Sequence, residues 1–354
     1  MKKRKIQLNS FMEIFIYTSQ TAHGIIVIVD NLVNAFQRKG VVCSHITTLN
    51  GRSVDDIIIS YGVKEANEVL QKGFRPFATF MADAITLGYR NKIAFYLRHL
   101  HFFHYDFFYS LYGYMRYRRQ ERNVARTYKN AIFVSDEDIK YFKENYSNSN
   151  CHYYCVANGA PEVDNVKEHV SSSVFRIGLL SQWGLKSLYE ESNWFVRSYW
   201  KRYYKTHKNC KLVVAGRGQY SKKLASLPGV DVVGAVPDLA DFFANIDVSL
   251  LLCPKGCGIL NRVLDSFMYR VPVVGYEASF SGFPDSDAIC FKFKDYRSFE
   301  LIMDKIIDDG NDAIERAKKA YEYVRKNHNW ENNYTELVES LIKEYEISST
   351  QSND

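Results

Sequence analysis

The segment GVDVVGAVPDLADFFANIDVSLLLCPKGCGILNRVLDSFMYRVPVVGYEASFSG, residues 229–282, decides the fold. Apolar runs of strand length lie at 230–233, 248–252 and 271–274, and segments of helical period lie between them. Strands and helices that alternate in this way predict a parallel sheet covered by helices. A strand predicted over 12–17, a helix from 25 to 36 and a strand over 41–47 repeat the alternation near the N-terminus. We therefore expect an α/β protein.

A loop of small residues follows the middle strand of this segment and leads into a helix predicted over 259–269. It contains Gly256, Cys257 and Gly258, and the helix opens at Ile259. Unpaired backbone N–H groups and the positive end of a helix dipole suit a phosphate, although turn chemistry alone can also produce Gly-x-Gly. Asp265 lies about two turns into the helix, where its carboxylate can accept hydrogen bonds from a ribose diol.

The segment resembles the donor-binding region of nucleotide-sugar glycosyltransferases. The resemblance lies in its order of elements: a strand, a glycine loop, a helix that carries an acidic residue, and a second glycine loop. The resemblance is to family four, retaining enzymes with two Rossmann-like parallel-sheet domains facing across a cleft (GT-B architecture). It implies transfer of a sugar from a nucleotide-sugar co-substrate, UDP- or GDP-linked, to a hydroxyl of a glycan or lipid-linked acceptor. It implies no metal and no further cofactor. The matching positions are Gly256, Gly258, Val263, Leu264, Met268, Pro272, Val273, Val274 and Gly282.

Three departures from the family pattern concern the site itself. Asp265 stands where the family has its ribose-binding Glu, Arg262 replaces the usual Lys, and Cys257 replaces a second Glu. A thiol cannot accept hydrogen bonds from sugar hydroxyls as a carboxylate does. Two interpretations follow: an active subgroup that uses the Gly-Cys-Gly backbone, or a non-catalytic protein that binds a sugar nucleotide without turnover.

The resemblance assigns further residues in the second half of the chain to the donor. Lys186, in the loop after the strand predicted over 175–180, is a candidate for the donor pyrophosphate, together with Arg262. Both are predicted to act in catalysis by stabilising the charge of the leaving diphosphate. Gly216 and Arg217 follow the strand predicted over 211–215 and resemble the family's Gly-x-Gly turn, with Arg217 reaching the base or the phosphates.

In the first half, two strand ends carry candidates. His23 and Gly24 follow the first strand and resemble the small-residue loop that faces the cleft in the family. Asp83 follows a strand predicted over 77–80, where many relatives have an acidic residue near the acceptor. We expect Asp83 to contact the acceptor hydroxyl or to act as a base. A plain helix N-cap is the competing interpretation for Asp83.

The stretch 89–119 is rich in aromatic and basic residues, with Asp106 as its single acid. Three interpretations stay open: a membrane or acceptor surface on the inner leaflet, a single-stranded nucleic-acid surface, or packed helices with solvated arginines. Of the first two, we expect the membrane and no nucleic acid. The basic residues are Arg90, Lys92, Arg98, Arg116, Arg118 and Arg119.

The whole sequence sets outer limits. Its 354 residues suit two domains, predicted at 1–168 and 169–330, with residues 331–354 forming a helix that packs back on the first domain and then a polar tail. The seven cysteines lack paired zinc-ligand spacing. No stretch supplies the about 20 apolar residues of a membrane-spanning helix. We expect a cytoplasmic protein, or one peripheral on the cytoplasmic face of the membrane, that serves bacterial surface polysaccharide synthesis.

Overall fold

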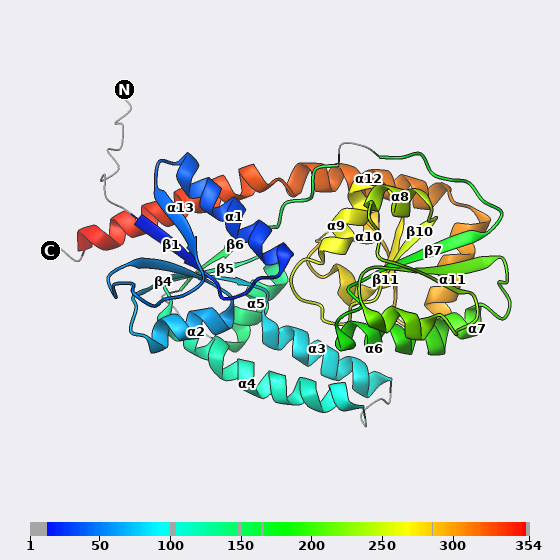
Figure 1. The fold of residues 1–354 in the computed structure, drawn as a ribbon, viewed down its shortest axis with the longest axis horizontal. Helices are drawn as coiled ribbons and strands as arrows, with labels where there is room; N and C mark the ends of the chain where they lie inside the picture. The colour runs from blue at the N-terminus through cyan, green and yellow to red at the C-terminus, as the bar shows by residue number, and fades with distance from the viewer. Residues whose placement is uncertain (1–12, 100–103, 147–150, 164–165, 285, 352–354) are drawn as a thin grey trace. The chain divides into compact units, whose positions relative to one another are not determined.

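The computed structural model contains two six-stranded sheets with helices around them (Figure 1). It describes residues 13–99, 104–146, 151–163, 166–284 and 286–351, without the side chains of His23 and of residues 348–351. The chain folds into two compact units. The first unit comprises Met1–Thr86, Tyr114–Gly159 and Asn329–Asp354, and the second comprises Leu87–Gly113 and Ala160–His328.

The sheet of the first unit has the strand order β2-β1-β3-β4-β5-β6, and its recorded pairings are all parallel. Its strands are β1 (Glu13–Tyr17), β2 (Val42–Ile46), β3 (Ile57–Tyr61), β4 (Pro76–Ala82), β5 (Asn130–Phe133) and β6 (His152–Cys155). The helices that follow them are α1 (His23–Arg38), α2 (Val63–Gln71), α3 (Ile85–Arg98), α4 (Tyr105–Thr127), α5 (Asp136–Asn145) and α13 (Trp330–Gln351).

The sheet of the second unit has the order β12-β11-β10-β7-β8-β9, again with parallel pairings. Its strands are β7 (Phe175–Leu180), β8 (Cys210–Ala215), β9 (Val230–Gly234), β10 (Val248–Leu251), β11 (Val273–Tyr276) and β12 (Phe291–Phe293). Its helices are α6 (Lys186–Phe195), α7 (Lys201–Tyr203), α8 (Leu239–Ala244), α9 (Asn261–Met268), α10 (Ser286–Ile289), α11 (Tyr296–Asp308) and α12 (Asn311–Asn327).

The segment 229–282 folds as its pattern predicts, into β9, α8, β10, α9 and β11. The strands β10 and β11 are buried on both faces because helices cover the sheet on each side, so they read as continuous apolar runs. The last strand begins at Val273 rather than at 271, after Pro272, which has no N–H to donate to a ladder. The α/β fold class is confirmed.

The helices α3 and α4 form a hairpin that lies within the predicted N-terminal domain, residues 1–168, and that the two compact units divide at Gly113. Phe95 and Tyr96 of α3 belong to the hydrophobic core of the second unit. The Phe95 ring lies 5.4 Å from that of Trp194 and 5.6 Å from that of Tyr276. Residues Leu87–Gly113 therefore belong to the second unit, and that unit resumes at Ala160 rather than at 169.

The C-terminal helix α13 belongs to the first unit. Tyr334 is fully buried there, with its ring 6.2 Å from that of Phe80 on β4. An ion pair between Lys39 and Glu339 joins the end of α1 to the same helix. The helix thus completes the core of a unit whose strands lie more than 170 residues earlier in the chain.

Candidate functional site

The strand order of the second sheet contains a switch point. From β7 the chain builds outward through β8 and β9, then crosses to the other side of β7 and continues through β10, β11 and β12. The loops after β7 and β10 therefore diverge at the carboxyl edge of the sheet. Ligands of open parallel sheets bind in the crevice at such a point. The glycine loop 254–258 follows β10 and so lies at this switch point.

The glycine loop needs its glycines for backbone reasons. Gly256 and Gly258 have φ angles of +58° and +65°, in the left-handed region that side chains with a Cβ avoid. A Cβ on Gly282, in the second glycine loop, would lie 2.6 Å from the Gly258 carbonyl oxygen. The two loops therefore pack backbone against backbone. Helix α9 begins at Asn261, two residues later than predicted, and Ile259 precedes it.

Arg262 and Asp265 lie one turn apart on α9 and so project from the same face. Arg262 Nη1 donates to the carbonyl oxygen of Leu180 at 2.8 Å, which ties α9 to the end of β7 across the switch point. Burial lowers the pKa of Arg262, although a guanidinium remains charged. Burial also raises the pKa of Asp265 to about 6, and the charge of Arg262 partly opposes this.

Helix α3 contacts the glycine loop directly. Asn91 Nδ2 donates to the carbonyl oxygen of Lys255 at 2.8 Å and approaches that of Gly256 at 3.4 Å. A Cβ on Gly88, one turn earlier, would lie 2.8 Å from Cys257 Sγ. The Cys257 side chain therefore packs against α3. Position 257 holds a compact thiol in this chain, whereas the family that the sequence resembles has a glutamate there.

Lys92 does not belong to the basic surface that the sequence predicts. Its side chain is buried, and its Nζ lies 2.9 Å from Glu191 Oε1 on α6. The negative charge of Glu191 also favours the charged form of Arg262. Lys92 therefore belongs to a buried ion pair with Glu191 rather than to a solvent-facing patch. Of the other predicted basic residues, Arg90 and Arg98 on α3 and Arg116, Arg118 and Arg119 on α4 are exposed.

A hollow of about 620 Å³ lies at the carboxyl ends of β8 and β9. Its walls are the turn Gly216-Arg217-Gly218, the residues 232–235 that end β9, and Ser221, Lys222 and Ala225. Neighbouring strands lie about 4.8 Å apart, so the hollow lies roughly 12 Å from the loop after β10. That span is comparable to an extended nucleoside diphosphate. One ligand could therefore reach both places.

Two glycines hold this turn against the loop after β7. Gly216 and Gly218 have φ angles of +122° and +128°. A Cβ on Gly218 would lie 2.0 Å from the Gly184 nitrogen, and one on Gly216 would lie 1.8 Å from the Ser181 carbonyl oxygen. Arg217 is exposed at the rim. Lys186 is the exposed first residue of α6, and its Nζ lies 5.2 Å from the centroid of the Tyr105 ring.

In the first unit, Asp83 follows β4 directly after Ala82, whose φ is +61°. Burial raises the pKa of Tyr61 at the end of β3, and the negative charge of Asp83 adds to this. Next to it, the N–H of Ala84 donates to Asp138 Oδ1 at 2.8 Å and the N–H of Thr86 donates to Glu121 Oε1 at 3.2 Å. Asp83 therefore lies at the carboxyl edge of the first sheet, and its contact with the acceptor stays a prediction.

Sequence reasoning missed Glu65, which lies at the switch point of the first sheet. Its carboxylate is fully buried and accepts hydrogen bonds from Ser19 Oγ at 2.7 Å and Gln20 Nε2 at 3.2 Å. Gly62, with a φ of +104°, gives it room. The sequence does contain a signal for it: Gly62 directly follows the apolar run of β3 and stands three residues before Glu65. His23 begins α1, but its side chain lies outside the described residues, and Gly24 is exposed in the first turn.

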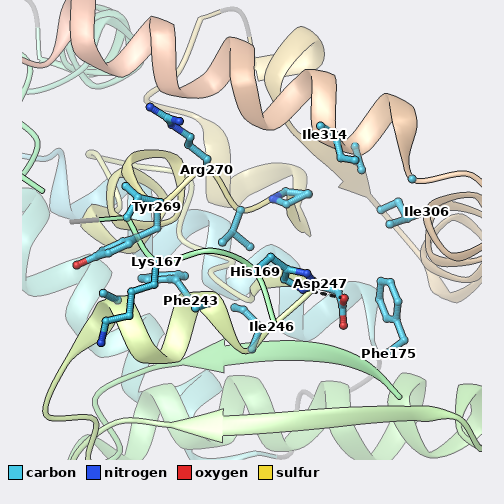
Figure 2. Close-up of a pocket in the computed structure, with 17 residues that line it drawn as sticks. Lys167, His169, Phe175, Phe243, Ile246, Asp247, Tyr269, Arg270, Ile306 and Ile314 are labelled. Atoms are coloured by element: carbon cyan, nitrogen blue, oxygen red, sulfur yellow. Dashed lines mark ion pairs between the residues drawn. The ribbon is translucent and has the colours of Figure 1, made fainter. Parts of the chain in front are cut away.

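A second cavity, of about 310 Å³, lies at the opposite edge of the second sheet (Figure 2). Phe175 opens β7, Asp247 precedes β10 and Pro272 precedes β11, so the cavity borders the amino ends of these strands. Its lining is mostly apolar, and His169 Nε2 pairs with Asp247 Oδ1 at 3.1 Å. Its position at the amino edge separates it from the glycine loops.

Metal sites and membrane spans are both absent from the part of the chain that the structure describes. Its residues contain no group of three or more His, Cys, Asp or Glu side chains placed to hold a metal ion. None of the helices among these residues combines the length and hydropathy required to cross a bilayer.

Comparison with known proteins agrees with this geometry. Residues 175–309 match the family described as Glycosyl transferases group 1. No curated protein sequence matches the chain. Sucrose-phosphate synthase from Thermosynechococcus elongatus is similar in structure, with a TM-score of 0.67 at 11% identity, over 95% of this chain and 100% of that one.

Two other solved structures are similar over nearly their full length. Anabaena HepE, solved with UDP and glucose, has a TM-score of 0.64 at 11% identity, over 94% of this chain and 100% of its own. WaaG, a glycosyltransferase involved in lipopolysaccharide biosynthesis, has a TM-score of 0.56 at 13% identity, over 92% and 99%. The GT-B fold and the resemblance to group 1 glycosyltransferases are confirmed.

Proposed function

We propose that this chain, whose residues 175–309 match the family Glycosyl transferases group 1, moves a sugar from a nucleotide-sugar donor to an acceptor hydroxyl with retained configuration. The observation that carries the proposal is the convergence at the switch point of the second sheet. The glycine loop after β10, the Arg262 guanidinium and the end of β7 meet there, held by the 2.8 Å bond from Arg262 to Leu180. Backbone N–H groups beside a half-buried cation suit a diphosphate.

Each part of the donor then has a partner. The diphosphate lies over Gly256–Gly258 beside Arg262, with Lys186 as a second cation from the start of α6. Asp265 accepts hydrogen bonds from the ribose diol in its ionised form. The base, of a UDP- or GDP-sugar, occupies the hollow between Gly216–Gly218 and residues 232–235.

The chemistry follows from where charge develops. As the bond from the anomeric carbon to the diphosphate breaks, negative charge grows on the diphosphate, and Arg262 and Lys186 stabilise it. The leaving diphosphate takes the proton of the acceptor hydroxyl, which attacks on the same face. This requires no metal. Asp83, with Glu65 as its neighbour around Tyr61, positions the acceptor hydroxyl.

The acceptor we propose is a glycan or a lipid-linked saccharide at the cytoplasmic face of a membrane, in bacterial surface polysaccharide synthesis. Two features support it. The first is the cluster of polar side chains Ser19, Gln20 and Glu65 at the switch point of the first sheet, which suits sugar hydroxyls. The second is an exposed apolar and basic helix face, described below.

The test is a thermal-shift and calorimetry panel against UDP, GDP, ADP, CMP and their sugar conjugates. We expect one base to raise the melting temperature, because ligands that bind only the folded state stabilise it. Arg262→Met should weaken that binding at least tenfold, whereas Asp247→Asn, at the amino edge, should leave it unchanged. Equal effects of the two variants, or no stabilisation at millimolar nucleotide, would refute the donor site.

Binding without turnover is the second candidate function, and one observation favours it. Cys257, in place of a sugar-binding glutamate, packs against Gly88 of α3. Incubation of the protein with the donor identified above separates the two functions. Release of free nucleoside diphosphate with water or an acceptor indicates a transferase. Tight binding with no release indicates a non-catalytic protein.

A further inference from the structure

Helix α4 exposes large apolar side chains on its first three turns. The exposed fractions are 64% for Tyr105, 56% for Phe108, 58% for Tyr112 and 66% for Met115. Soluble proteins scatter such residues singly, and a contiguous set marks an interaction surface. The buried face of α4, which includes Ser110 and Gly113, lies on the opposite side of the helix.

The acidic side chains of α4 are buried, whereas its basic side chains are exposed. Its two acids, Asp106 and Glu121, are both buried: Asp106 accepts a hydrogen bond from Tyr96 at 3.4 Å, and Glu121 accepts one from the Thr86 backbone at 3.2 Å. The exposed charged side chains of Tyr105–Thr127 are all arginines, at positions 116, 118, 119, 122 and 126. The solvent-facing side of α4 is therefore cationic, with no acid to offset it.

Apolar and cationic residues follow one line along this side. Because α4 is one unbroken helix, a spacing of three or four residues places side chains on the same face. The first half of the line is apolar and the second half is basic, each over about 10 Å at 1.5 Å per residue. We call this line the α4 stripe; its members are Phe108, Tyr112, Met115, Arg119, Arg122 and Arg126.

We propose that the α4 stripe docks the protein on an anionic lipid membrane. Phe108, Tyr112 and Met115 enter the boundary between headgroups and acyl chains, and the arginines bind lipid phosphates. The proposal rests on the proposed function in one respect, since a lipid-linked acceptor gives docking its purpose. A single-stranded nucleic acid fits less well, because it requires bases stacked on rings along a cationic groove, whereas along the α4 stripe the rings and the arginines occupy separate halves.

The test is flotation of the full chain with vesicles of phosphatidylcholine alone and with 30% phosphatidylglycerol added, at several salt concentrations. We expect binding to the anionic vesicles only. Arg119→Gln, Arg122→Gln and Arg126→Gln together should weaken it about a hundredfold, since each basic residue near an anionic surface adds severalfold to affinity. Phe108→Ser, Tyr112→Ser and Met115→Ser together should weaken it at least tenfold.

Matched controls make the same kinds of substitution at exposed positions outside α4. Lys318→Gln, Arg325→Gln and Lys326→Gln on α12 remove three exposed charges, and Val54→Ser, Leu301→Ser and Ile314→Ser remove three exposed apolar side chains. Both sets should bind vesicles like the unmodified protein. All targets are on the surface, so circular dichroism should report intact folding.

Two results would overturn the proposal: no binding of the unmodified protein to anionic vesicles, or α4 variants that bind like the controls. Tight binding to a single-stranded oligonucleotide without vesicle binding would replace the lipid by a nucleic acid. Nucleotide binding is measured without vesicles, so failure of docking and failure of the donor site are distinguishable.

Discussion

The two edges of the second sheet differ in what they offer a ligand. At the carboxyl edge, glycines at 216, 218, 256 and 258 have positive φ angles, and backbone meets backbone at Gly216, Gly218 and Gly282. Arg262 and Asp265 lie on the helix that follows the glycine loop. At the amino edge, mostly apolar side chains line a cavity in which Asp247 pairs with His169 (Figure 2). In a parallel sheet the carboxyl ends of the strands and the N-termini of the helices that follow them lie at the same edge, so ligand-binding groups collect at that edge.

The largest expected difference concerns Gly218. Gly218→Ala places a Cβ 2.0 Å from the Gly184 nitrogen at a φ of +128°, so we expect a loss of roughly 3 kcal/mol of unfolding free energy from backbone strain. Denaturant unfolding measures it. Gly184→Ala is the matched control, because a Cβ there meets no atom within 4 Å. Equal stability of the two variants would contradict the close packing of this edge.

Asp265→Asn should come next. The ribose diol loses a charged acceptor, so we expect donor affinity to fall by about 1.5–3 kcal/mol, or tenfold to more than a hundredfold. Calorimetric titration with the nucleotide measures it. Asp247→Asn makes the same chemical change at the amino edge and should leave the affinity unchanged. If both variants bind alike, the ribose contact is not at Asp265.

The pH dependence should separate binding from stability at Asp265. Its pKa is raised by burial to about 6 in the folded protein, above its ordinary value of 3.8. Donor affinity should therefore fall as the pH drops through about 6, and Asp265→Asn should flatten the profile. The sign for folding is opposite: the carboxyl stabilises the fold when protonated, and this stability is lost as the pH rises through 6. Asp265→Asn should then be at least as stable as the unmodified protein at pH 8, and lower stability there would contradict the raised pKa.

Asn91→Ala tests whether α3 positions the glycine loop. Loss of the 2.8 Å bond to the Lys255 carbonyl should weaken donor binding by about 0.5–1.5 kcal/mol, through a loop that is less well ordered. Titration with the nucleotide again measures it. Asn145→Ala removes a similar bond, to the Tyr141 carbonyl at 2.9 Å on α5, and should not change donor binding. An unaltered affinity in Asn91→Ala would remove α3 from the donor site.

The smallest effect should come from filling the amino-edge cavity. Ala244→Leu, at the end of α8, adds apolar volume to a space of about 310 Å³. We expect a gain of about 0.5–1 kcal/mol in unfolding free energy, as is common for cavity-filling changes, and no change in donor affinity. Thermal unfolding with and without nucleotide measures both. A change in donor affinity would connect the two edges.

Sequence reasoning worked best where strands are buried on both faces, since apolar runs such as 248–252 identify them directly. It missed β3, although Ile57, Ile58 and Ile59 form such a run, and with it the buried Glu65 that follows. It located the glycine loop and Asp265, whose spacing is local. It could not find Asn91 or Glu191, because their partners are 164 and 99 residues away along the chain.

The sequence by itself determined the alternation of strands and helices and the positions of the glycines, because both follow from periodicity and φ angles within a few residues. The tertiary structure decided which charges are available. Lys92 and Arg119 look alike in a basic stretch, yet one is buried against Glu191 and the other faces solvent on α4. Burial depends on the neighbours that the fold brings in from distant segments. A local pattern therefore cannot tell a structural ion pair from a docking surface.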